Sequence, residues 1–407
     1  MKKAEKNSTR NWMLLAAAVV APLLIAEIAL HGFIPAADRP EAFAHQLSEN
    51  PKLFYDPVPR ASREVTYFEG TVDETAVRYE INAAGFRDRD YSVKPPSGVE
   101  RIVFLGDSIV FGFSVDGHDA MPKQLEQRFR DHDDATQVLN MGVSGYDTEQ
   151  EVEFFKVKGA AYEPDLVVVG YALNDARYAS WELDVLRNNW EAFVRQPATN
   201  IRTKTLAFLF KNSRILDLLN RQFHIQKRAS FLQAYPLLFD FVEEKYLSQR
   251  DPEGSPYRRL EALIQQEATR LGTPEPALNY MMQGIGFRNE NPVFSSHWQL
   301  SEAAFRDLAQ LSKERGFGVA VVLWPLMSSM ATYPLGPLHQ FLRVKLEAMG
   351  FEVIDPKDYL QELWMSHGDK LSLDGIHFTP WANEKISNFL YPRIRDILRA
   401  QASDNDG

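Results

Sequence analysis

The stretch RIVFLGDS, from Arg101 to Ser108, decides the fold of this chain. Four apolar residues in succession, followed by a glycine, predict a buried strand that ends in a tight turn. Glycine allows the backbone to turn sharply, and a serine on such a turn is held at the edge of a sheet with its hydroxyl exposed. A helix that begins after Ser108 would favour negative charge developing beside it. The alternative is that Asp107 and Ser108 do no more than cap this helix.

Four more apolar runs follow this strand, with amphipathic stretches between them. The runs are QVLNMG (137–142), DLVVVGY (165–171), GVAVVLWP (318–325) and FEVIDP (351–356). The helical patterns cover about residues 119–131, 148–159, 299–315, 336–349 and 381–400. Continuous apolar runs are typical of parallel strands covered on both faces, and strand–helix alternation implies right-handed crossovers. We therefore predict an α/β fold, a doubly wound, mostly parallel five-stranded sheet with helices on both faces.

The alternation is interrupted once, between the third and fourth strands. Residues 176–296 have mainly helix and loop patterns, and we expect them to form a helical insertion or cap. Residues 34–95 are rich in proline and charge, and we expect a linker followed by a lead-in segment. The main domain is expected to span residues 96–400, and residues 401–407 to form a short acidic tail.

The N-terminus combines a basic leader with an apolar run. Residues 1–11 carry four basic side chains and one acidic one, and residues 12–33 are mostly apolar. About 20 apolar residues can cross a bilayer as one helix, and a basic flank stays on the cytoplasmic side. We expect a single-pass signal anchor at 12–33 in the cytoplasmic (inner) membrane, with the rest of the chain on the extracytoplasmic, periplasmic side. A cleaved signal peptide and a buried core helix are the alternatives.

Composition excludes several classes of function. The 407 residues include no cysteine, which rules out a disulfide scaffold, a thiolate metal site and a cysteine nucleophile. The net charge of −10 argues against a nucleic-acid partner, because phosphate binding requires a basic face. His118 and Asp119 lie side by side, but no second histidine follows within two helical turns, so we expect no metal there.

Three further motifs follow predicted strands or precede the last helix. NMGVSG (140–145) is a glycine-bearing turn that can point a backbone N–H into a site, and Asn174 can donate its amide to an oxyanion. Asp374 lies three residues before His377 and can hold the imidazole in the tautomer that accepts a proton from a serine. Each motif alone has an ordinary explanation as a loop, a helix cap or a surface histidine beside an acid. The motifs occur in a fixed order and mostly at strand ends, where ligands bind in open α/β sheets. This arrangement favours one shared site.

These blocks, GDS, NMGVSG, LND and DGIH, resemble those of the SGNH hydrolases, also called GDSL-type esterases and lipases. The segments YEINAAGFRDRDY (79–91) and GDSIVFGFSVDG (106–117) are similar to a membrane-anchored bacterial branch of that family. The resemblance is close over residues 79–175, looser over 297–400, and does not cover the insertion. One position departs from the pattern, because Ala172 stands where the family usually has a glycine.

The resemblance implies a role for each matched residue. Ser108 is the nucleophile, His377 is the general base and later the general acid, and Asp374 orients His377. The backbone N–H groups of Ser108 and Gly145, with the side-chain amide of Asn174, form the oxyanion hole. The implied fold is the SGNH or flavodoxin-like sheet, and the reaction requires no cofactor and no metal.

The expected function is hydrolysis of an acyl ester, with an acylated glycan or lipid as candidate substrate and deacetylation as one form of the reaction. Two alternatives stay open. With the same residues, an acyl-enzyme that meets a sugar hydroxyl would make an O-acyltransferase acting on a cell-surface polysaccharide. The chain could also be a non-catalytic carbohydrate-binding or assembly protein with a degenerate site. We expect contact with the membrane only through the N-terminal helix.

Overall fold

The computed structural model describes residues 18, 20–30, 45–48, 50, 52–53, 55–68, 70–175, 213, 215–216, 256–284, 297–327 and 330–405. The chain divides into two compact units. One consists of residues 1–42 and 188–237, and the other of residues 43–187 and 238–407. The second unit contains the predicted sheet and all four sequence blocks.

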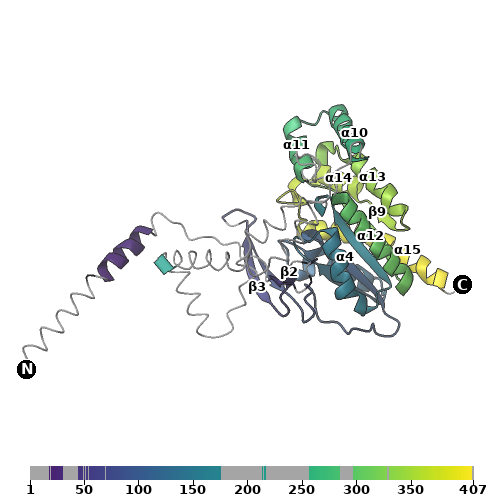
Figure 1. Cartoon of the computed structure of the whole chain (residues 1–407), viewed down its shortest axis with the longest axis horizontal. Coiled ribbons are helices and arrows are strands. Elements are labelled where there is room, and N and C mark those ends of the chain that lie inside the picture. The colour runs from purple at the N-terminus through teal and green to yellow at the C-terminus, as the bar shows by residue number, and fades with distance from the viewer. Residues whose placement is uncertain are drawn as a thin grey trace, which may run out of the picture. The chain divides into compact units, whose positions relative to one another are not determined.

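A five-stranded parallel sheet forms the centre of the second unit (Figure 1). Its strands are β5 (Glu100–Gly106), β6 (Thr136–Gly142), β7 (Leu166–Ala172), β8 (Gly318–Trp324) and β9 (Glu352–Ile354). The spatial order is β6-β5-β7-β8-β9, and every neighbouring pair is parallel. All residues of β7 are buried, as expected for a strand covered on both faces. The predicted doubly wound α/β fold is confirmed.

Helices cover both faces of this sheet. On one face α3 (Met121–Asp131) contacts α15 (Pro380–Asn405), and on the other α4 (Thr148–Val157) contacts α12 (His297–Arg315). The chain reverses its direction across the sheet after β6, so right-handed crossovers place α3 and α4 on opposite faces. Helix α13 (Gly336–Glu347) connects β8 to β9 and contacts β9. The reversal also creates the switch point at the carboxyl ends of β5, β6 and β7, where a ligand site is expected.

Three glycines line up across this switch point. Gly106 of β5 is in register with Gly142 of β6 and with Gly170 of β7. A Cβ atom on Gly142 would lie 2.3 Å from the backbone nitrogen of Phe111, and one on Gly170 would lie 2.6 Å from Cγ2 of Val110. Both contacts are with α2 (Ser108–Phe111), the short helix that follows β5. The absence of side chains on the glycines therefore allows α2 to lie against the strand ends.

The lead-in segment contains two antiparallel strand pairs that we did not predict. Strand β1 (His45–Leu47) pairs with β2 (Tyr55–Pro57), and β3 (Ser62–Tyr67) pairs with β4 (Thr75–Glu80). Asp88 attaches the segment to the sheet domain, because its carboxylate pairs with Lys123 of α3 at 3.0 Å and accepts a hydrogen bond from the backbone nitrogen of Asn140 in β6. The lead-in segment is thus an integral part of the larger unit.

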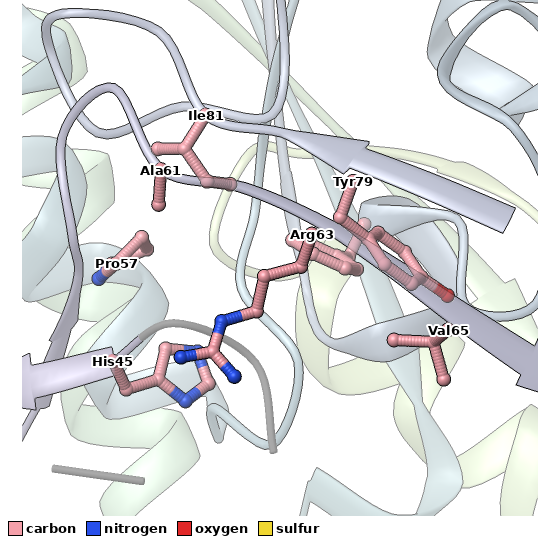
Figure 2. Close-up of a pocket in the computed structure, with 8 residues that line it drawn as sticks. His45, Pro57, Ala61, Arg63, Val65, Tyr79 and Ile81 are labelled. Atoms are coloured by element: carbon pink, nitrogen blue, oxygen red, sulfur yellow. The ribbon is translucent and has the colours of Figure 1, made fainter. Parts of the chain in front are cut away.

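A small cavity lies between the two strand pairs and α2. Figure 2 shows the Arg63 side chain pointing toward His45, with Tyr79 on the neighbouring strand β4 and Ile81 just after that strand. Burial, and then the positive charge of Arg63, lowers the pKa of His45 to about 3, so its ring is neutral. The cavity measures about 10 Å³, which is room for a single water molecule. It is too small to hold an organic substrate.

Several elements differ from the prediction at their ends or in number. Helix α14 (Lys357–His367) was not predicted, and α15 continues to Asn405, through most of the expected acidic tail. Within the expected insertion the structure describes helices α10 (Pro256–Leu271) and α11 (Glu275–Gly284). Apart from residues 213 and 215–216, positions 176–255 lie outside the described residues, as do 285–296. The cap role of the insertion stays a prediction.

Residues 20–30, inside the expected anchor, form a helix. Its Glu27 carboxylate accepts hydrogen bonds from the Ser213 hydroxyl at 2.9 Å and from the Ile215 backbone nitrogen at 3.1 Å, both in the same compact unit. Positions 12–17, 19 and 31–33 lie outside the described residues. Among the residues that are described, no helix has both the length and the apolar character needed to cross a bilayer. The anchor therefore stays a prediction.

Candidate active site

Ser108 lies on a sharp turn at the carboxyl end of the central strand β5. Asp107 caps the following helix, because its Oδ1 atom accepts a hydrogen bond from the Ile109 backbone nitrogen at 2.9 Å. Helix α2 has only four residues and ends at Gly112, whose φ of 86° requires glycine. The capping role expected for Asp107 is present, but so short a helix contributes little dipole to the site.

The structure brings His377 and Ser108 together although 269 positions separate them. The Nε2 atom of His377 lies 2.8 Å from the Ser108 hydroxyl oxygen. The Nδ1 atom lies 2.6 Å from Oδ2 of Asp374. A carboxylate can only accept, so Nδ1 must carry the proton, and Nε2 of the neutral ring accepts from the serine hydroxyl. The ring is thus held in the tautomer that can remove the serine proton.

The Asp374 carboxylate is fixed by its own loop. Its Oδ1 atom accepts hydrogen bonds from the backbone nitrogens of Ile376 at 2.9 Å and His377 at 2.8 Å. Burial acts to raise the pKa of Asp374, but the His377 ring and these two N–H groups outweigh it and lower the pKa to about 2. Asp374 is therefore ionised at every pH at which the protein would be expected to work.

The His377 ring is also covered on one side by an aromatic ring. Phe113, in the loop after α2, stacks on the imidazole with the ring centroids 4.2 Å apart and the planes 24° from parallel. Tyr67 of β3 packs against Phe113 edge-on, at 4.9 Å. The stack restricts rotation of the imidazole between its two hydrogen-bond partners. Sequence reasoning did not identify Phe113, because no motif marks a residue that acts only by packing.

A buried arginine from the lead-in segment holds the loop that carries Phe113. The Arg87 guanidinium donates hydrogen bonds to the carbonyl oxygens of Phe111 at 2.8 Å, of Gly112, and of Val115 at 2.5 Å. Its side chain lies over the Tyr79 ring at 4.2 Å, and only 3% of the residue is exposed. Burial lowers the pKa of Arg87 to about 10, which leaves it charged at neutral pH. Arg87 belongs to the quoted segment 79–91, but we assigned it no role from the sequence.

Gly145 and Asn174 lie on the two segments that flank Ser108. Gly145 follows β6 with a φ of 90°, and Asn174 lies in the single turn (Leu173–Asp175) after β7. The Asp175 carboxylate fixes that turn by accepting hydrogen bonds from the Ala172 backbone nitrogen at 3.1 Å and from the Thr148 hydroxyl at 3.3 Å. Ala172 itself is a strand residue with negative φ, so alanine fits there without strain. The oxyanion-hole assignment of Ser108, Gly145 and Asn174 stays a prediction.

A groove of about 590 Å³ opens beside the imidazole. One wall is formed by His377 and Asp374 with the start of α15, including Trp381. The β3–β4 hairpin and the segment after α2 also contribute to its lining. The groove is large enough for the alcohol part of an ester and is the larger of the two described cavities.

A second group of Asp, His and hydroxyl side chains lies elsewhere in the domain. His339 lies 3.0 Å from Asp355 through Nδ1 and 2.9 Å from the Tyr333 hydroxyl through Nε2. The Tyr333 hydroxyl also accepts a hydrogen bond from the Leu326 backbone nitrogen. With 2% of His339 exposed, no substrate can reach this group. Its geometry serves to fix the segment after β8.

The described residues hold no group of three or more histidine, cysteine or acidic side chains arranged to bind a metal ion. His118, which we considered for a metal, has 78% of its side chain exposed and lies 3.4 Å from Asp119. Nothing in the proton-transfer geometry of Ser108 and His377 requires a cofactor.

Comparison with solved structures returns ester-cleaving enzymes with low overall similarity. An esterase from Pseudoalteromonas sp. shares 10% identity, covers 74% of this chain and 99% of its own, and has a TM-score of 0.37. A lipase/acylhydrolase from Enterococcus faecalis shares 15% identity, covers 73% and 96%, and has a TM-score of 0.35. An acetylxylan esterase from Geobacillus stearothermophilus shares 14% identity, covers 72% and 92%, and has a TM-score of 0.35. No curated protein matches the sequence.

The sequence of residues 104–385 matches the GDSL-like Lipase/Acylhydrolase family. This match spans more than half of the chain and includes all four sequence blocks, from Gly106-Asp107-Ser108 to Asp374-Gly375-Ile376-His377. The resemblance to the SGNH hydrolases is therefore confirmed, whereas membership of a membrane-anchored branch stays a prediction. The chain belongs to the GDSL-like lipase/acylhydrolase family of ester-hydrolysing enzymes.

Proposed function

We propose that this enzyme cleaves acyl esters through a covalent intermediate on Ser108. The observation that supports this most directly is the 2.8 Å separation between the Ser108 hydroxyl oxygen and Nε2 of His377. A free serine hydroxyl is a weak nucleophile and needs an adjacent base. The supporting carboxylate of Asp374 lies on the other side of the same ring, 2.6 Å away.

In the first step, the Ser108 oxygen attacks the ester carbonyl while His377 takes the serine proton. The carbonyl oxygen becomes an oxyanion, for which the N–H groups of Ser108 and Gly145 and the Asn174 amide are the proposed donors. When the intermediate collapses, His377 gives its proton to the leaving alcohol, and the acyl group stays on Ser108. Asp374 stabilises the imidazolium that exists between the two proton transfers.

In the second step, an acceptor hydroxyl replaces the alcohol that has left. His377 takes its proton as the acceptor oxygen bonds to the acyl carbon. The acyl–Ser108 bond then breaks, and His377 gives the proton to the Ser108 oxygen, which regenerates the serine. If the acceptor is water, the product is a free acid. The groove beside His377 is large enough for an alcohol acceptor, which supports transfer to a glycan hydroxyl as the second candidate reaction. Analysis of the products with and without added glycan separates the two, because a transferase leaves the acyl group on the glycan.

The test of the hydrolase uses the full chain and a chromogenic acetyl ester. Ser108→Ala should reduce turnover by at least about a thousandfold, since it removes the nucleophile. His118→Ala, which changes an exposed residue outside the proposed triad, serves as the control and should leave turnover unchanged. A fluorophosphonate probe should label the wild type and not Ser108→Ala. Equal turnover by Ser108→Ala would refute the assignment, and a wild type that is inert to both reagents would favour the non-catalytic alternative.

We also propose that the enzyme works on the extracytoplasmic face of the inner membrane. The support is the sequence of residues 1–33, with a basic leader before a long apolar run. Full-length protein should stay with membranes after alkaline extraction, and protease added to spheroplasts should digest it. Release of the full chain by alkali would contradict the anchor.

A further inference from the structure

The groove beside His377 is lined by an excess of negative charge. Five aspartates contribute to its lining, and one of them, Asp374, is paired with the catalytic imidazole. The four others lie on the hairpin, on the loop after α2 and before α15, and they are Asp73, Asp116, Asp119 and Asp369. Among the residues that line the groove, Lys370 is the single permanently cationic side chain.

Hydrogen bonds and contacts within the protein engage only some of these charged side chains. Asp116 accepts a hydrogen bond from the Arg78 backbone nitrogen at 3.1 Å, which fixes the carboxylate without neutralising it. Asp119 lies 3.4 Å from the exposed ring of His118. Lys370 directs its ammonium group over the Trp381 ring, 4.7 Å from the centroid. In the part of the chain that the structure describes, no lysine or arginine forms an ion pair with these four carboxylates, although the charge of Arg87 acts on Asp116.

One of these carboxylates, that of Asp119, shows the effect of burial and of its neighbours on its pKa. Burial raises the pKa of Asp119, and the negative charge of Asp116 adds to the effect, while His118 opposes it. Charges in a concave site are screened less by water than charges on a flat surface. A further negative group that entered the groove would be repelled, and a positive group would be attracted.

The position of the groove indicates which part of an ester would experience this charge. His377 lines the groove, and in the proposed mechanism it gives its proton to the alcohol oxygen as the bond between that oxygen and the acyl carbon breaks. The segments that carry Gly145 and Asn174, the proposed oxyanion donors, do not contribute to the groove lining. We therefore place the alcohol part of the ester, and not its carbonyl oxygen, in this groove, which borders His377 but not Ser108.

We propose that the groove selects the alcohol part of the substrate by its charge. A cationic alcohol is favoured over a neutral one, and an anionic one is rejected; this inference rests on the proposed function. Microscopic reversibility extends the same preference to an alcohol that accepts the acyl group, because it must occupy the place of the one that left. Asp119 and Asp369 are the specificity-determining residues to test first, since they come from two different segments that line the groove, the turn before α3 and the turn before α15.

The experiment compares three acetate esters of similar size with the full chain. Acetylcholine carries a cationic alcohol part, neohexyl acetate is its uncharged isostere, and acetoxyethanesulfonate is anionic. At low ionic strength we expect kcat/KM to fall in that order, by about tenfold from the cation to the anion, and the ratio to shrink as salt is raised. Asp119→Asn and Asp369→Asn should each reduce the ratio about threefold. Glu314→Gln, an equal charge change at an exposed position of α12, should leave it unchanged.

A binding measurement keeps this inference separate from the proposed chemistry. The Ser108→Ala protein is titrated with choline and with isethionate, the alcohols of the cationic and anionic esters, so that charge preference is read without turnover. Tighter binding of choline, weakened by Asp119→Asn, is the expected result. Equal binding of the two alcohols, tighter binding of isethionate, or no binding of either would overturn the charge selection. Loss of Ser108-dependent hydrolysis alone would overturn the proposed reaction instead.

Discussion

Replacing Asp374 with asparagine tests how the imidazole is held. The substitution is nearly isosteric, and its oxygen can still accept from the backbone nitrogens of Ile376 and His377. Its NH₂ group, however, would face Nδ1 of His377 in place of a carboxylate oxygen. The ring then carries its proton on Nε2, where it can no longer accept the proton of Ser108. Turnover should fall because the wrong tautomer is stabilised.

The exposure of Asp374 in the structure indicates how far kcat should fall. In a fully buried serine-protease triad the same change lowers kcat by about 10⁴. Here 31% of the Asp374 side chain is exposed, so water can support the imidazolium in part, and we expect a loss of about 10²–10³. The same substitution should also change the free energy of unfolding. The pKa of Asp374 is lowered from 3.8 to about 2, and at 1.36 kcal/mol for each pKa unit the folded state favours the charged form by about 2.4 kcal/mol.

The sign of the stability effect follows from the lowered pKa. A carboxylate with a folded pKa below its unfolded pKa stabilises the protein fully above about pH 4, and this contribution is lost as the pH falls through about 2. Urea unfolding of the wild type should therefore show a gain of up to about 2 kcal/mol over that window that Asp374→Asn lacks. Asp396→Asn, on the exposed side of α15, is the control. Wild-type kcat in Asp374→Asn would refute the orienting role, and an identical pH dependence of unfolding would refute the electrostatic one.

Three other substitutions separate rate from stability. Arg87→Lys should lower kcat by about tenfold with KM little changed, because one ammonium nitrogen cannot occupy the places of both Nη1 and Nη2, and the loop that carries Phe113 loosens; unchanged kcat in steady-state kinetics would contradict this role of Arg87. Gly142→Ala should lower the free energy of unfolding by about 3 kcal/mol or more, since its Cβ atom would lie 2.3 Å from the Phe111 backbone nitrogen. A melting temperature equal to that of the wild type would show that α2 can move away freely. His339→Gln should cost about 1–3 kcal/mol of stability through its lost partners and leave ester hydrolysis intact; abolished hydrolysis in a folded protein would show that this buried group reaches the active site after all.

The sheet could be predicted because its signals are local. Each strand of the sheet is a short apolar run next to a turn, and all five runs found in the sequence are strands, with ends that differ by at most two residues. The meeting of Ser108 with His377 was predictable from the rule that parallel strands present their carboxyl ends at one edge, together with the family's motifs. Helix α14 (Lys357–His367) was missed because its apolar positions follow closely on those of β9.

The lead-in segment could not be predicted in the same way. Strands β1 and β2 have three residues each, and β3 leaves alternate residues exposed, so neither hydrophobicity nor length distinguishes them from a linker. The contact between Phe113 and His377 depends on the path of a loop and on a distant arginine. Such packing is decided by tertiary structure and leaves no spacing pattern in the sequence.

We expect the lead-in segment to affect both the rate and the specificity of the reaction. Its Arg87 holds the loop of Phe113, the ring that stacks on His377, and its β3–β4 hairpin supplies Phe68 and Asp73 to the wall of the groove. The predicted domain boundary at residue 96 would separate these residues from the site, whereas the compact unit extends back to residue 43. Because one segment steadies the imidazole and also shapes the groove, a substitution within it can change turnover and substrate choice together. The exposed surface of α12 contacts neither the imidazole nor the groove lining, so substitutions there should change neither.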